Sequence, residues 1–201
     1  MAIRVNGELV SSRSVVMELT RLVNFYREHL PDEDLEENRD ILVRKAKDQA
    51  IGARLLLEEA RKAGVRVPEN DVTARRAVLV AEAGGEEAFS QLLDAQGMDE
   101  EWFRRNIVES LMIDKLVKAL VGRVEDPTDG DVAEYLAQLK GEGRSVTAAQ
   151  ARDVLTHERR GRVISECVAH LRKKAAIEDD EELDGSDIDA MFDAQGGDEA
   201  E

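Results

Sequence analysis

Side chains that could carry out catalysis or bind a metal are few in this sequence. The chain has three histidines, His29, His157 and His170, and one cysteine, Cys167. On a helix, Cys167 and His170 would lie one turn apart on a shared face, whereas His157 would lie well off that face. Because a metal site needs three or four converging ligands, we expect no metal centre and no cofactor.

The sequence patterns of common enzyme sites are also missing. We find no glycine-rich phosphate loop, no Gly-x-Ser-x-Gly turn and no Cys/His arrangement for nucleophilic catalysis. The many carboxylates stand on charged helices, where neighbouring acids usually form a solvated face. A single cysteine excludes an internal disulfide and suits a reducing compartment. We therefore predict that the protein is not an enzyme.

Acidic residues are unevenly distributed along the chain. The 201 residues include 44 Asp and Glu against 28 Lys and Arg, a net charge of −16. Residues 178–201 hold 12 of the acids and no base, so residues 1–177 carry a net charge of only −4. This predicts two parts: a folded body, residues 1–177, and an acidic, disordered tail, residues 178–201. Such a tail repels phosphate backbones, and no basic stripe offsets it, so nucleic-acid binding is disfavoured.

Neither a membrane span nor a secretory signal is evident in the sequence. No apolar run approaches the roughly 18 residues that a transmembrane helix needs. The first residues also lack the apolar stretch of a signal peptide. We therefore expect a cytoplasmic chain that does not insert into a membrane.

The spacing of apolar residues predicts a mainly helical, all-α fold with a short N-terminal strand pair. Asn6-Gly7 is a preferred tight-turn pair, and residues 3–5 and 8–10 flank it as short strands. We expect the first strand to lie beside the end of the body near Ile177. Capping residues set the helix starts, among them Asn70, Asp99 and Thr147 with Gln150. The predicted helices cover residues 12–30, 38–63, 71–83, 86–95, 100–121, 129–139 and 148–175.

The helix predicted over residues 100–121 is apolar over a wide arc. In a small domain such an arc leaves Leu, Met and aromatic side chains available to bind unfolded segments, and flexible Met side chains suit many partners. The candidates for client binding are Phe89, Met98, Trp102 and Phe103. The alternative is that these side chains are ordinary core residues.

The acidic tail contains one short amphipathic pattern. Ile188, Met191 and Phe192 are spaced i, i+3 and i+4, and Ser186 precedes them as a cap. This spacing is typical of a segment that folds as a helix into a partner's groove. Three uses remain open: binding a specific outside protein, occupying the body's own client-binding surface, or solubilising the chain.

Several segments, in order, resemble the SurA/PrsA family of extracytoplasmic chaperones and parvulin-type prolyl isomerases. Each segment is degenerate alone, but their order and spacing over residues 3–136 make the resemblance more specific. The segments are Val5-Asn6-Gly7-Glu8, residues 55–65, Val67-Pro68-Glu69-Asn70-Asp71-Val72, residues 84–104, residues 126–135 and the closing residues 171–178.

The resemblance implies a helical chaperone body like the SurA N-terminal and trigger-factor C-terminal domains. In the family a parvulin module comes after the segment that ends here at Tyr135, yet only about ten residues separate Tyr135 from Thr147. The resemblance therefore implies a chaperone body without the isomerase module. Because the family is mostly exported, a periplasmic location remains an alternative to the cytoplasm.

Together these features predict an ATP-independent holdase that binds unfolded or nascent polypeptides and lacks prolyl isomerase activity. The competing hypothesis is an adaptor or scaffold, which would bind one folded partner through the body and recruit another through the tail.

Overall fold

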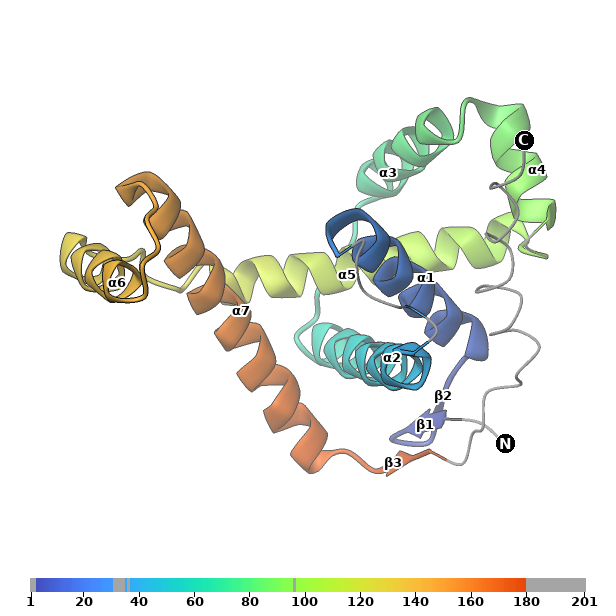
Figure 1. Ribbon diagram of the computed structural model, residues 1–201. Helices are drawn as coiled ribbons and strands as arrows, with labels where there is room; N and C mark the ends of the chain where they lie inside the picture. The colour runs from blue at the N-terminus through green and yellow to red at the C-terminus, as the bar shows by residue number, and fades with distance from the viewer. Residues whose placement is uncertain (1–2, 31–34, 36, 96, 180–201) are drawn as a thin grey trace, which may run out of the picture. The chain divides into compact units, whose positions relative to one another are not determined.

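A computed structural model of the chain describes residues 3–30, 35, 37–95 and 97–179 (Figure 1). Within these ranges it contains seven helices and three short strands, so the all-α fold with a small N-terminal sheet is confirmed. In chain order the elements are β1 (Ile3–Val5), β2 (Glu8–Val10), α1 (Ser12–His29), α2 (Arg39–Lys62), α3 (Glu69–Glu82), α4 (Glu86–Ala95), α5 (Glu100–Val121), α6 (Asp129–Gly141), α7 (Ala148–Lys174) and β3 (Ile177–Glu178).

The chain forms two compact units. Unit 1 consists of residues 1–56 together with 171–201, and unit 2 consists of residues 57–170. Both boundaries fall inside long helices, one in α2 and the other in α7. The sequence carries no loop or composition signal at these points, because each helix continues without a break from one unit into the other.

The sheet of unit 1 joins the two ends of the body. Asn6 (φ 53°) and Gly7 (φ 82°) both adopt the left-handed conformation that a two-residue hairpin needs, and they connect β1 to β2. The strand order is β2-β1-β3, with Val5 opposite Glu8 on one side and opposite Ile177 on the other. The prediction that the first strand lies beside the end near Ile177 is thus confirmed.

A contiguous apolar core fills unit 1. Ile3, Val5, Val15, Leu19 and Leu42 are completely buried in it. The end of the body contributes as well, because Leu171, Ala175 and Ile177 pack against this core from the C-terminal side. Residues from both ends of the body therefore stabilise the same core.

Capping interactions explain where most helices of unit 2 begin. The Asp99 carboxylate accepts a hydrogen bond from the Trp102 amide at 2.6 Å and starts α5. Before α7, the Thr147 amide donates to Gln150 Oε1 at 2.9 Å while the Gln150 amide donates to Thr147 Oγ1 at 3.2 Å, which confirms the predicted capping box.

The predicted cap of α3 is wrong. The helix begins at Glu69 with Pro68 in the capping position, so Asn70 already lies inside the first turn. Pro68 has an extended ψ of 147°, and its carbonyl accepts from the Asp71 amide at 3.0 Å. Acidic side chains in the first turn favour the positive end of the helix dipole, which stabilises this start without a side-chain cap.

Candidate functional site

Three of the four candidate client-binding residues flank the turn between α4 and α5, and the fourth lies on α4. Gly84 (φ 93°) and Gly85 (φ 115°) reverse the chain between α3 and α4, and Gly97 (φ 59°) does so between α4 and α5. These turns allow α3 to pack against both α4 and α5. We call α3, α4 and the first part of α5, residues 69–107, the three-helix region.

Phe89 and Phe103 form the aromatic contact at the centre of this region. Their rings meet edge to face, with centroids 4.9 Å apart and an angle of 70° between the planes. Phe89 is only 3% exposed, whereas Phe103, Met98 and Trp102 are half-buried. Phe89 therefore lies in the interior of the region, and the other three side chains keep part of their surface accessible to solvent.

Arg76 of α3 connects all three helices of the region. Its guanidinium donates to both carboxylate oxygens of Glu86 on α4, at 2.7 and 2.9 Å, and to Glu100 on α5 at 2.6 Å. The same group lies 5.4 Å from the centroid of the Phe89 ring, a cation–π distance. A planar, five-donor guanidinium can make these contacts at once, which a lysine cannot.

The charges around Arg76 stabilise one another. Hydrogen bonds to Glu86 and Glu100 raise the pKa of Arg76 above its already high value. The hydrogen bond from Arg76 lowers the pKa of Glu86. Two further ion pairs join α3 to α5, Arg104–Glu69 at 2.5 Å and Lys115–Asp71 at 2.8 Å. Charged groups on the surface therefore hold the three helices around the Phe89–Phe103 contact.

Many apolar side chains of unit 2 are partly accessible. Each described helix of this unit buries only one or two apolar residues, Phe89 and Leu93 on α4 for example. Leu92 on α4 is 47% exposed and Val78 on α3 is 46% exposed. Along α5 the half-buried apolar residues are Trp102, Phe103, Val108, Leu111, Met112, Ile113, Val117, Leu120 and Val121. Such a surface can bind apolar segments of another polypeptide.

The role of Arg76 was not evident from the sequence. Its partners stand 10 and 24 residues away, beyond the range of helix-periodicity or capping patterns. The one available signal is that residues 77–103 contain no base, so any cation that pairs with their acids must come from outside this segment.

Other candidates from the sequence lie elsewhere. Ile188, Met191 and Phe192 of the tail fall outside the described residues, so their role stays a prediction. Cys167 on α7 is half-buried, and burial, with a smaller contribution from the charge of Glu59, raises the pKa of its thiol. Over residues 3–30, 35, 37–95 and 97–179 no group of three or more His, Cys, Asp or Glu side chains could hold a metal ion. None of the helices described combines the length and apolarity that crossing a membrane requires.

A family comparison identifies the N-terminal part of the chain. Residues 1–117 match the model of the SurA-like N-terminal domain, well over half of the chain. The chain belongs to this family. Among curated proteins, no sequence matches it. The SurA-like N-terminal domain is a chaperone-type, non-catalytic module, and the matched segment includes Phe89, Met98, Trp102 and Phe103. The resemblance inferred from the sequence is therefore confirmed.

The connection between α6 and α7 is short. It consists of six residues, 142–147. This is far too few for a folded module, which usually needs at least about 50 residues. The parvulin module expected in the family at this point is therefore absent between α6 and α7.

Proposed function

We propose that this protein is an ATP-independent holdase that binds unfolded or nascent polypeptides through the three-helix region. The observation that carries the proposal is the partly accessible apolar surface of that region, with Met98, Trp102 and Phe103 half-buried and Leu92 47% exposed. Membership of a chaperone-type family supports it. Apolar burial supplies the binding energy, at roughly 25 cal/mol per Å² of surface removed from water.

Buried Phe89 has a supporting role in this proposal. Its ring holds Phe103 by the edge-to-face contact and lies beneath the Arg76 guanidinium. Phe89 thus fixes the position of a side chain that clients contact. The accessible contact residues are Met98, Trp102, Phe103 and Leu92.

Trp102 offers a direct assay, since it is the only tryptophan in the chain. We expect its fluorescence to change when unfolded, tryptophan-free polypeptides are added, and we expect the protein to suppress aggregation of several unrelated denatured clients. The substitution Leu92→Gln should weaken both effects. Val154→Gln is the matched control, because Val154 on α7 is also 40% exposed and lies outside the three-helix region.

The adaptor hypothesis predicts a different result. A single folded partner would bind tightly and in fixed stoichiometry, and denatured clients would not compete with it. If the tail recruits that partner through Ile188, Met191 and Phe192, the substitution Phe192→Ala abolishes the interaction. Affinity purification with and without residues 178–201 distinguishes the two functions.

A further inference from the structure

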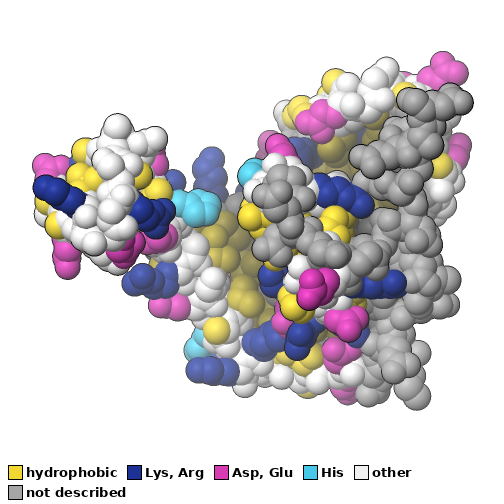
Figure 2. Space-filling view, in the orientation of Figure 1, with side chains coloured by type: hydrophobic (Ala, Val, Ile, Leu, Met, Phe, Trp, Pro, Cys, Tyr) yellow, Lys and Arg dark blue, Asp and Glu magenta, His cyan; other side chains and the backbone are white. Residues whose placement is uncertain are grey.

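The three-helix region is negatively charged, with nine acids against four bases over residues 69–107. Residues 77–103, which run from α3 through α4 into the start of α5, contain seven acids and no base. The acids are Glu82, Glu86, Glu87, Asp94, Asp99, Glu100 and Glu101. Apolar (yellow) and acidic (magenta) side chains both reach the surface of α3 and α4 in the space-filling view (Figure 2).

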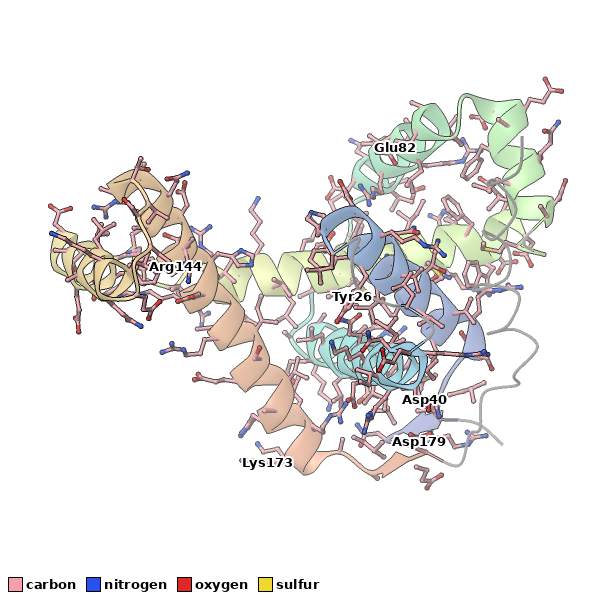
Figure 3. All side chains as sticks on the ribbon, in the orientation of Figure 1. Tyr26, Asp40, Glu82, Arg144, Lys173 and Asp179 are labelled. Carbon is pink, nitrogen blue, oxygen red and sulfur yellow. The ribbon has the colours of Figure 1, made fainter. Side chains whose placement is uncertain are left out.

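Only some of these acids have a cationic partner. Arg76 pairs with Glu86 and Glu100, and Arg105 pairs with Glu101 at 3.2 Å. By contrast, Glu82, Glu87 and Asp94 are exposed and form no ion pair with a described residue. Figure 3 labels Glu82 at the C-terminal end of α3. The region therefore keeps negative charge that no described base of the chain neutralises.

One unpaired acid shares a helix face with an exposed apolar side chain. Glu82 follows Val78 by four residues on α3, the spacing at which helical side chains are neighbours, and both side chains are exposed. Glu87 and Asp94 lie on a different face of α4 from Leu92 and add to the negative charge of the region. At physiological ionic strength the Debye length is about 8 Å, so two exposed charges interact appreciably only within about that distance. A cation next to an apolar side chain of a client would therefore be attracted to Glu82 while that apolar side chain contacts Val78.

We propose that the three-helix region selects unfolded segments in which Lys or Arg stands next to apolar residues. This inference rests on the holdase function proposed above and names its client class. Charge complementarity carries it, because the surface is both apolar and negative. The chain's own tail, with 12 acids and no base, is repelled from this surface, and so is a second copy of a chain with a net charge of −16.

The test uses three tryptophan-free peptides that share the same apolar residues and differ only in flanking Lys, Ser or Glu. Binding to the full-length protein is followed by Trp102 fluorescence. We expect the Lys peptide to bind most tightly and the Glu peptide least, with a difference of roughly tenfold that shrinks as salt is raised. Equal affinities for the three peptides would overturn the charge selection and leave the holdase proposal intact. If none of the peptides binds, the holdase proposal itself is wrong.

A charge-reversed variant locates the effect. The double substitution Glu82→Lys with Glu87→Lys should weaken binding of the Lys peptide and strengthen binding of the Glu peptide. The control, Glu134→Lys with Asp153→Lys, makes the same change in net charge on α6 and α7, where both acids are exposed. Circular dichroism melts check that both variants fold. The same response in the control as in the Glu82/Glu87 variant would show that only net charge matters and would overturn the inference.

Discussion

Asn6 and Ala176 pair reciprocally across 170 positions of sequence. The Asn6 amide donates to the Ala176 carbonyl at 2.8 Å, and the Ala176 amide donates to Asn6 Oδ1 at 3.0 Å. Asn6 also occupies the left-handed turn between β1 and β2. One residue thus shapes the N-terminal hairpin and binds the segment between α7 and β3 to it, so the two ends of the body form a single sheet.

We expect substitutions of Asn6 to separate its two roles. Asn6→Gly keeps the positive φ but removes the Oδ1 acceptor, and should lower the free energy of unfolding by about 1 kcal/mol. Asn6→Ala also strains the backbone, which should cost roughly 1–2 kcal/mol more. Urea unfolding of both variants measures the two contributions. Equal stability of the Gly variant and the parent would show that the Ala176 hydrogen bond contributes nothing.

Both ends of the body, residues 1–10 and residues 172–177, should be needed for unit 1 to fold. Ile3→Ala empties a fully buried position, and we expect a loss of about 2–5 kcal/mol. Leu9→Ala is the control, because Leu9 is 52% exposed and should change stability by less than about 0.5 kcal/mol. Deleting residues 1–10, or truncating before Arg172, should destabilise the whole unit. An unchanged melting midpoint after either truncation would contradict this.

Arg76→Lys should loosen the three-helix region although the charge is kept. Lysine cannot bond both oxygens of Glu86 and also reach Glu100, so we expect a lower melting midpoint and a shifted Trp102 emission. The difference from the parent should shrink at high salt, since these ion pairs are partly exposed. Arg75→Lys is the control, as Arg75 is exposed and forms no ion pair with any described side chain. Equal effects of the two substitutions would argue against a special role for Arg76.

Acid should weaken the start of α6. Hydrogen bonds from the Thr128 hydroxyl and amide, at 2.6 and 2.7 Å, lower the pKa of Asp131, and Arg159 adds to this. Because the native pKa lies below the unfolded one, the contribution to stability is complete above about pH 5 and is lost as the pH falls through the unfolded and then the native pKa. Asp131→Asn should therefore reduce the loss of stability between about pH 5 and about pH 3, measured by urea unfolding. Identical pH profiles for variant and parent would rule this contribution out.

We expect no prolyl isomerase activity. The six-residue connection between α6 and α7 leaves no module that could hold a twisted X-Pro bond. A protease-coupled assay with a proline peptide should give the uncatalysed rate at any concentration of the pure protein. Clear acceleration that survives repurification would contradict the prediction.

Much of the helical architecture could be predicted because its signals are local. Three helix caps accept a hydrogen bond from the backbone amide three residues further along, namely Ser11, Asp99 and Thr147. Both partners of such a bond therefore lie within a short stretch of sequence. The error at α3 has a local cause too. The helix starts two residues earlier than expected, with Pro68 in the capping position, and the Pro68 carbonyl takes the place of the Asn70 side chain.

The candidate site could be predicted only in part. Residue type and periodicity pointed to Met98, Trp102 and Phe103, whose side chains are half-buried. Residue type and periodicity could not distinguish these three accessible residues from Phe89, which is almost completely buried, because exposure depends on the neighbouring helices. Leu92 was missed for the same reason, since in the sequence it looks like one more core position of α4.

By itself the sequence determined the helical class, the hairpin at Asn6-Gly7 and most helix ends, since each depends on residues within a few positions. It also determined the family, through the order and spacing of segments along the chain. Only the tertiary structure decided which distant groups meet: Arg76 with Glu86 and Glu100, Phe89 with Phe103, and Asn6 with Ala176. The division into two units was likewise decided by packing. Its boundaries lie within the continuous helices α2 and α7, where the backbone hydrogen bonds run on without a break. Only the set of residues that the helix contacts changes at each boundary.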